Sequence, residues 1–296
     1  MEDMGSKDKG MGKAYLIAQE LMKDRLKSVN PEAYEELKDV NAADVLVVPG
    51  QYDHIEDVLR LAGTRFTLVA PGQFDRITLR PDQILFINCP GNLTTVGLRK
   101  LESFVSTGGF LFTTDWALKH VLEPAFPGYL RYNQRATADE VVRVEVMNTE
   151  DPFLKSLLGP DDDPQWWLES SSYPIQIADG KKVNVLVSSK EIAAKYGEAP
   201  VFVTFEYGEG KVYHMISHFY LQRSETRTKR HQASAEAYLN EKEIPDGLRA
   251  KYSGMGVAEA RLADVESAFT SSAMMSKVML DKKLQMRRKK DDTKKG

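Results

Sequence analysis

The chain has 296 residues, a formal net charge of −3 and 42% hydrophobic residues, which is enough for one sizeable core with appendages. The slight acidic excess argues against nucleic-acid binding by the core, and the single cysteine excludes both an intramolecular disulfide framework and a cysteine-built zinc site. No apolar run approaches the roughly 20 residues of a membrane span, and the polar start lacks the apolar centre of a secretory signal, so we expect a cytoplasmic protein.

Residues 1–40 predict an N-terminal helical arm. Residues 1–12 are polar and are expected to be disordered. Apolar residues between Tyr15 and Leu26 recur at helical spacing. A second, shorter helix is expected to begin at Pro31, because the first helical position does not need the N–H that proline lacks. Neither helix contains a motif, so we expect both to dock on the domain that follows.

Residues 41–225 predict the main domain. Four apolar runs indicate buried strands, at 45–48, 66–69, 84–89 and 110–113. Helical patterns separate these runs, the clearest from Thr94 to Thr107, where Gly108 and Gly109 end the helix. Continuous apolar strands that alternate with helices are typical of a parallel sheet covered on both faces. We therefore predict an α/β fold with a mainly parallel, flavodoxin-like sheet.

The carboxyl ends of these predicted strands place two polar loops on one rim. Ligands of parallel sheets bind beyond those ends. Cys89 and Asn92 lie in the loop after the third strand, and Asp115 and Trp116 lie directly after the fourth. Both loops are therefore candidate parts of a functional site.

The second half of the domain predicts an antiparallel extension of the sheet. A strand is expected at 141–146. One hairpin is expected between 173–177 and 183–188, around a turn formed by Asp179 and Gly180. A second hairpin is expected between 201–207 and 211–217, around the sequence Gly-Glu-Gly.

Residues 226–296 predict a C-terminal helical arm with a basic tail. Ala258, Leu262, Val265 and Phe269 follow helical spacing and form one apolar stripe. The stripe is too apolar to be left in water, yet it lies beyond the sheet domain, so we expect this helix to dock on a partner protein or on a second copy of the chain. The last 15 residues contain eight Lys or Arg and two Asp and are expected to be solvated.

The order of the motifs resembles the class I glutamine amidotransferase-like superfamily, over roughly Val45 to Leu221. The motifs are VLVVPG, ILFINCPGN, LRKLESFVSTGGFLFTTDWA and GEGKVYHMISHFYL. The helix pattern L..FVS.GG, followed at once by a strand, is similar to the trehalose-utilisation type. It is also similar to the N-terminal domain of an intraflagellar-transport subunit, in which the fold is non-catalytic.

Catalytic members of this superfamily carry a cysteine on a G-x-C-x-G elbow after a strand, and a histidine followed by Pro-Glu after a later strand. There the thiolate is exposed on the rim and the imidazole takes its proton. In this chain the elbow reads TTDWA, so Asp115 has the nucleophile's place and no glycine flanks it. His218 has about the place of the histidine, but Phe219 and Tyr220 follow it, and Cys89 lies where relatives usually place oxyanion-binding backbone. The resemblance therefore implies a domain without glutaminase activity.

Each candidate residue also has a structural interpretation, which we favour. Cys89 is either a displaced nucleophile or a buried thiol at the end of a strand. Asp115 is either a nucleophile or metal ligand, or the N-cap of a helix that begins at Trp116. His214 and His218 would face the same side of one strand, where they could bind a metal ion, act as a base or be structural histidines. The pair Trp166–Trp167 and the loop 169–173 could line the rim or be ordinary packing and loop residues.

Two functions from different classes remain open. The first is a non-catalytic domain that acts as a protein-binding or assembly module, without cofactor or metal, whose rim binds rather than reacts. Its candidate binding residues are Asn92, Asp115, Trp116 and His218. The second is a hydrolase with a non-standard site assembled from Asp115, His218 and possibly Cys89. The missing cysteine elbow favours the first, with no nucleic acid expected for the core.

Overall fold

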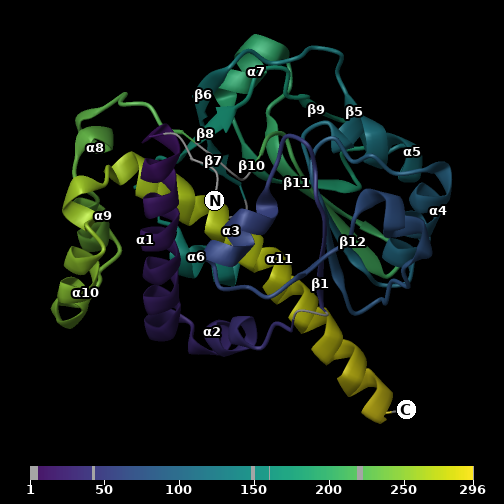
Figure 1. Cartoon of the computed structure of the whole chain (residues 1–296), viewed down its shortest axis with the longest axis horizontal. Coiled ribbons are helices and arrows are strands. Elements are labelled where there is room, and N and C mark those ends of the chain that lie inside the picture. Colours follow the sequence, from purple (N-terminus) through teal and green to yellow (C-terminus); the bar gives the residue numbers. More distant parts are fainter. Residues whose placement is uncertain (1–5, 42–43, 148–150, 160, 219–222, 296) are drawn as a thin grey trace.

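The computed structural model describes residues 6–41, 44–147, 151–159, 161–218 and 223–295. At its centre lies an eight-stranded sheet in the order β2-β1-β3-β4-β12-β11-β10-β7 (Figure 1). Its strands are β1 (Val45–Val48), β2 (Thr67–Leu68), β3 (Ile84–Ile87), β4 (Phe110–Thr114), β7 (Glu145–Val146), β10 (Val183–Ser188), β11 (Pro200–Tyr207) and β12 (Gly210–Met215). Neighbours from β2 to β12 are parallel, and those from β12 to β7 are antiparallel. The predicted α/β fold, a mainly parallel sheet with an antiparallel extension, is confirmed.

The parallel strands are aligned so that their carboxyl ends meet at one edge of the sheet. Val48 of β1 pairs with Ile87 of β3, and Ile87 pairs with Thr113 of β4. On the other side of β4, Thr114 pairs with Met215 of β12. Every residue of β1, β3 and β4 is buried. The loops that follow β3, β4 and β12 therefore share one rim.

Helices cover both faces of the sheet. On one face α4 (Thr95–Ser106) contacts β4 and β12, and Gly210 permits the close approach, since a Cβ there would lie 2.1 Å from the Val105 carbonyl oxygen. On the other face lies α11 (Leu262–Lys295), where the Tyr213 hydroxyl donates a hydrogen bond to Asp281 across 2.7 Å. Residues 210 and 213 of one strand point to opposite faces, as the strand period requires.

The remaining helical segments are shorter, apart from α1. They are α1 (Ser6–Val29), α2 (Pro31–Lys38), α3 (Ile55–Leu61), η1 (Pro71–Arg76), η2 (Leu118–Leu122), α5 (Glu123–Ala125), α6 (Pro152–Leu157), α7 (Lys190–Tyr196), α8 (Lys229–Gln232), α9 (Ala235–Glu241), η3 (Asp246–Leu248), α10 (Arg249–Gly254) and η4 (Val257–Glu259). None of the helices within the described ranges is long and apolar enough to cross a membrane.

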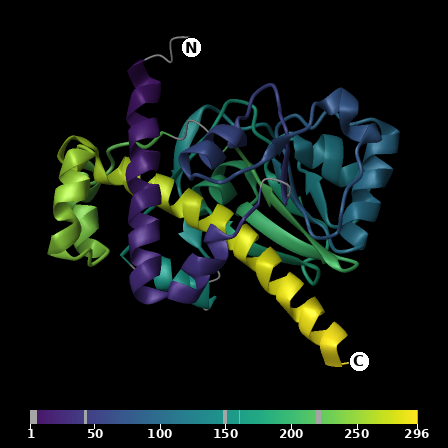
Figure 2. The same cartoon turned by 60° about the horizontal axis from the view of Figure 1, so that its bottom comes forward.

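The first and last long helices, α1 and α11, pack side by side (Figures 1 and 2). Leu262, Val265 and Phe269 of the C-terminal stripe are each 0% exposed. The expectation that this stripe is free for a partner is therefore wrong, because α1, α2, α8 and α9 of the same chain contact the helix. Helix α1 begins at Ser6, so the disorder predicted for residues 1–12 is also wrong from residue 6 onward.

The basic tail is not wholly solvated. Lys282 is 2% exposed, and its ammonium group donates hydrogen bonds to the carbonyl oxygens of Pro81 and Gly108 at 2.5 and 2.7 Å. Its ammonium also lies 4.7 Å from the centre of the Phe110 ring. The start of the tail therefore anchors α11 at the amino-terminal edge of β4, and the expectation of a solvated tail is wrong for this residue.

One of the two predicted hairpins forms. β11 and β12 pair around the Gly-Glu-Gly turn, as expected. The other prediction is wrong: β9 (Ile175–Ile177) pairs with β5 (Leu130–Tyr132) in a separate two-stranded sheet, whereas β10 pairs with β11. Stacking of Tyr132 on Tyr173, with ring centres 3.8 Å apart, supports the β5–β9 pairing.

The strand predicted at 141–146 is divided between two sheets. Its first part is β6 (Glu140–Arg143), which pairs with β8 (Gln165–Leu168), and its second part is β7, which pairs with β10. The division falls at Val144, whose backbone N–H donates to the Pro164 carbonyl oxygen.

Candidate functional site

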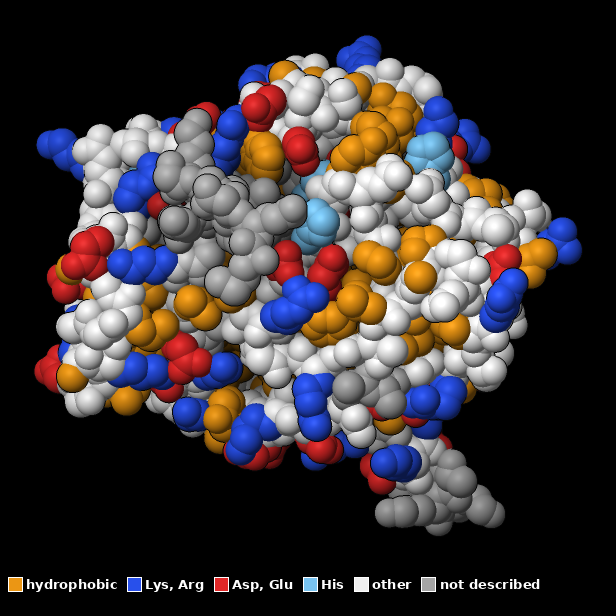
Figure 3. Space-filling view, viewed as in Figure 1, with side chains coloured by type: hydrophobic (Ala, Val, Ile, Leu, Met, Phe, Trp, Pro, Cys, Tyr) orange, Lys and Arg blue, Asp and Glu red, His pale blue; other side chains and the backbone are white. Residues whose placement is uncertain are grey.

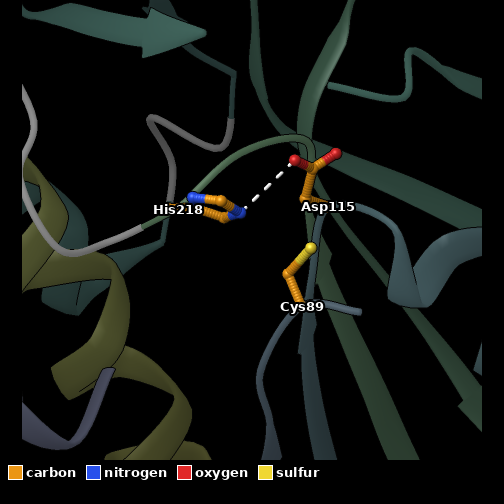
Figure 4. Close-up of side chains that lie close together, drawn as sticks. All are labelled: Cys89, Asp115 and His218. Atoms are coloured by element: carbon orange, nitrogen blue, oxygen red, sulfur yellow. Dashed lines mark ion pairs between the residues drawn. The ribbon is translucent and has the colours of Figure 1, made fainter. Parts of the chain in front are cut away.

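Three candidate residues converge at the rim (Figure 4). Cys89 follows β3, Asp115 follows β4 and His218 follows β12. A sulfur, a carboxylate oxygen and a ring nitrogen of these side chains all lie within 4.8 Å of one another. The three residues are 1%, 3% and 5% exposed, respectively. We call them the rim cluster.

Asp115 forms a sharp turn at the end of β4. Its φ is +45°, in the left-handed region, which aspartate tolerates better than most residues other than glycine. The Asp115 carboxylate accepts hydrogen bonds from the backbone N–H of Tyr173 at 2.9 Å and from the hydroxyl of Ser172 at 3.1 Å. An elbow thus forms here without flanking glycines.

The predicted N-cap role of Asp115 is wrong. The helical turn after the elbow begins at Leu118, its N-cap is Ala117, and that end has no side-chain cap. Only the backbone carbonyl of Asp115 accepts from Leu118 N–H, across 2.9 Å. The carboxylate is bound instead by the 172–173 loop, and its burial raises the pKa of Asp115, partly offset by His218, Tyr173 and Ser172.

Cys89 is held by its backbone on both sides. Its N–H donates to the Thr114 hydroxyl at 3.1 Å, and its carbonyl oxygen accepts from Gln51 N–H at 3.0 Å. Gly50 permits the second contact, because a Cβ at that position would lie 2.1 Å from the Cys89 carbonyl oxygen. Burial raises the pKa of the Cys89 thiol, and contact with His218 offsets this only in part. The thiol is free and is protonated near neutral pH.

His218 lies between two carboxylates. Its Nε2 is 3.4 Å from Asp115 Oδ2, and its Nδ1 is 2.6 Å from Glu169 Oε2. Burial disfavours the charged ring, but the contacts with Asp115, Cys89 and Glu169 outweigh it and raise the pKa of His218 well above its usual value. These contacts therefore favour the charged, imidazolium form of the side chain.

Glu169 was not singled out from the sequence as the partner of His218. It belongs to the polar loop 169–173, whose placement at the rim was one of two open interpretations. The loop supplies Glu169 to His218 and Ser172 and Tyr173 to Asp115. The only feature of the sequence that could have indicated Glu169 is the run of polar residues before a short strand.

Trp116 lies next to the cluster in a row of aromatic rings. It stacks on Tyr173 with ring centres 5.5 Å apart and meets Tyr52 edge-on at 5.3 Å. Tyr173 in turn stacks on Tyr132. Tyr52 is 51% exposed, and the other three rings are half-buried. We call these four side chains the aromatic rim.

The other sequence candidates lie elsewhere. Asn92 is exposed and is not part of the cluster. His214 does not reach the rim, because β12 ends at Met215, and its buried ring lies beside Thr113, 2.8 Å from Nδ1 to Oγ1. Trp166 is buried in β8, and Trp167 in the same strand hydrogen-bonds Asp139. Phe219 and Tyr220 lie outside the described residues.

Charged and histidine side chains lie close to the rim. In Figure 3 acidic side chains gather with a histidine near the middle of this face, close to α3. His54 Nδ1 lies 3.3 Å from Glu56 Oε1 at the start of α3, and the Asn88 amide donates to Glu56 Oε2 at 2.8 Å. The loop after β3 is thus tied to α3 by polar contacts.

No family model and no curated protein sequence matches this chain. Among solved structures, it is similar to a cytoplasmic protein from Salmonella typhimurium, with 14% identity and a TM-score of 0.43 over 60% of this chain and 89% of that one. A ThuA-like protein from Bacteroides uniformis has 17% identity and a TM-score of 0.41, covering 58% and 80%. A β-galactosidase from Bacillus circulans has 11% identity and a TM-score of 0.40, covering 63% of this chain and 31% of its own. These likenesses are too distant to bear on function.

Proposed function

We propose that this chain is a non-catalytic, amidotransferase-like domain that binds a protein partner through the aromatic rim. The observation that carries the proposal is the row of stacked and partly exposed rings beside position 115. Tyr and Trp are enriched in protein interfaces, where they supply large contact areas with few rotatable bonds. The rim would then bind a protein partner and catalyse no reaction.

The state of the rim cluster supports the absence of cysteine chemistry. A thiolate is the reactive form of cysteine, and burial keeps the Cys89 thiol protonated. His218 is already protonated between Glu169 and Asp115, so it cannot take the thiol proton. Two cavities of about 670 and 1140 Å³ lie along α11 and beside α6, and neither is lined by a residue of the cluster.

A pair of alanine substitutions tests the binding proposal. Tyr52→Ala with Trp116→Ala should abolish recovery of a specific partner that the wild-type chain captures and that mass spectrometry identifies. Met147→Ala is the matched control, because Met147 is equally exposed at 51% but follows β7, at the opposite edge of the sheet from β1. Unchanged recovery by the double variant would refute the proposal, as would glutamate release from glutamine that Cys89→Ser abolishes.

The convergence of the rim cluster favours a second candidate, a hydrolase. A carboxylate that can activate water and a protonated imidazole that can stabilise developing negative charge are brought together here from separate loops. Under this alternative, the chain hydrolyses a simple ester such as p-nitrophenyl acetate, and Asp115→Asn removes the activity. Equal rates for the wild type and the variant would exclude it.

A further inference from the structure

We propose that the rim cluster binds one divalent cation of the zinc class through Cys89 Sγ, Asp115 Oδ2 and His218 Nε2. This inference goes beyond the protein-binding function and does not depend on it. The three side chains come from three loops at the carboxyl edge of the sheet, and their ligand atoms all lie within 4.8 Å of one another (Figure 4). Three protein ligands with one further position for water is the arrangement of open zinc sites.

The spacing of two donors matches a shared metal ion. His218 Nε2 lies 3.4 Å from Asp115 Oδ2. Two ligand atoms about 2.1 Å from a tetrahedral zinc ion are about 3.4 Å apart, whereas a charge-assisted N–H···O hydrogen bond spans about 2.7–2.9 Å. The Cys89 sulfur lies within 4.8 Å of both donors, and in an occupied site it would be about 3.6 Å from each.

The nitrogen that would bind the ion faces Asp115 but is not committed to a hydrogen bond. His218 Nε2 is buried and makes no hydrogen bond among the described residues. The opposite ring nitrogen, Nδ1, is 2.6 Å from Glu169 Oε2. A carboxylate on the far nitrogen of a metal-binding histidine fixes the ring orientation and leaves the near nitrogen with a lone pair for the metal. Glu169 is therefore the orienting residue of the site.

The Asp115 carboxylate is held in place before any ion binds. Tyr173 N–H fixes Oδ1 at 2.9 Å, and the Ser172 hydroxyl fixes Oδ2 at 3.1 Å. The set of one thiolate, one imidazole and one carboxylate selects a borderline-soft cation such as Zn²⁺ over Mg²⁺ or Ca²⁺, which take oxygen ligands. A thiolate and a carboxylate also neutralise the two positive charges of the ion.

Cobalt substitution tests the site directly. The full-length chain is stripped of metal with a chelator, and then Co²⁺ or Zn²⁺ is added and the bound metal is counted. We expect one equivalent of either ion, and with Co²⁺ a sulfur-to-cobalt charge-transfer absorption. Because Cys89 is the only cysteine in the chain, that absorption identifies it as a ligand without any variant. Absence of the absorption at saturating Co²⁺ would overturn the proposal.

Variants then assign the other ligands. Cys89→Ser, Asp115→Asn and His218→Gln should each lose stoichiometric binding, and Glu169→Gln should weaken it about 10–100-fold, as orienting residues do. His120→Gln is the matched control, because His120 is exposed and is not one of the three clustered ligands. Binding that survives His218→Gln, or is lost in the control, contradicts the assignment. A folded wild-type chain that binds no Zn²⁺ refutes the site while leaving the protein-binding proposal intact.

Discussion

The Gln19 side-chain amide donates a hydrogen bond to the Ser272 hydroxyl, across 2.8 Å in the buried contact between α1 and α11. These residues lie near opposite ends of the chain, and both are at most 2% exposed. A polar contact that is buried and satisfied between two helices fixes their register. The two terminal segments are therefore parts of one packed layer over the sheet and are not free arms.

Truncation after Pro245 should abolish cooperative folding. This deletion removes α11, and with it fully buried side chains such as Leu262, Val265 and Phe269, each of which contributes very roughly 1.5–3 kcal/mol. The measurement is thermal unfolding followed by circular dichroism. A chain that ends at Lys290 is the control and should melt like the full-length protein. A sharp, native-like transition in the chain that ends at Pro245 would contradict the packing described here.

Lys282 should make stability rise with pH in alkaline solution. Burial, with a smaller effect of Lys289, lowers the pKa of Lys282 from 10.5 to about 8. Between these values the unfolded chain binds more protons than the folded one, so the free energy of unfolding increases with pH, by at most about 1.4 kcal/mol per pH unit.

The comparison with Lys282→Met isolates this effect, because other groups titrate in the same range. Urea unfolding of both proteins is measured at several pH values. The wild type should gain stability relative to the variant from about pH 8 to 10.5. A stability difference that stays constant across that window would show that Lys282 does not titrate as described.

Strands β1, β3 and β4 could be predicted because each is a continuous, largely apolar run that ends at a recognisable turn. The convergence of Cys89, Asp115 and His218 follows from the same pattern, since residues after neighbouring parallel strands meet at one edge. The β5–β9 pairing could not be predicted, because three-residue strands carry too little periodicity to specify a partner. The prediction that Asp115 is an N-cap was wrong because no local sequence pattern indicates a left-handed backbone at a residue other than glycine.

His214 should make the protein sensitive to acid. Burial lowers the pKa of His214 to about 3 from 6.5, and its ring is 0% exposed. Below pH 6.5 the unfolded chain binds a proton at His214 that the folded chain does not bind. The free energy of unfolding therefore falls as the pH decreases toward 3, by at most about 1.4 kcal/mol per pH unit. The variant His214→Asn should be less stable near neutral pH but should lose less stability on acidification. Parallel stability curves for the two proteins would contradict the prediction.

The stability of variants at Asp115 should depend on two features, the left-handed backbone at this position and the hydrogen bond to the 172–173 loop. Asp115→Ala places alanine at a φ of +45° and leaves the buried Tyr173 N–H without its acceptor. The unmade hydrogen bond alone costs about 1–3 kcal/mol. Asp115→Gly loses the same acceptor but relieves a left-handed backbone, which costs other residues roughly 1–2 kcal/mol. Asp115→Asn keeps an acceptor oxygen and tolerates the backbone.

The expected order of stability in metal-free protein is therefore wild type, then Asn, then Gly, then Ala, measured as the free energy of unfolding in urea. Asn, Gly and Ala all leave His218 with Glu169 as its one remaining carboxylate partner among those described at the rim, so the gap between Asn and Gly reports the loop contact less the backbone strain that Gly relieves. An alanine variant as stable as the glycine variant would mean that the elbow is not strained. An alanine variant as stable as the wild type would mean that the carboxylate does not hold the 172–173 loop, and the pre-organised ligand on which the metal site depends would be lost with it.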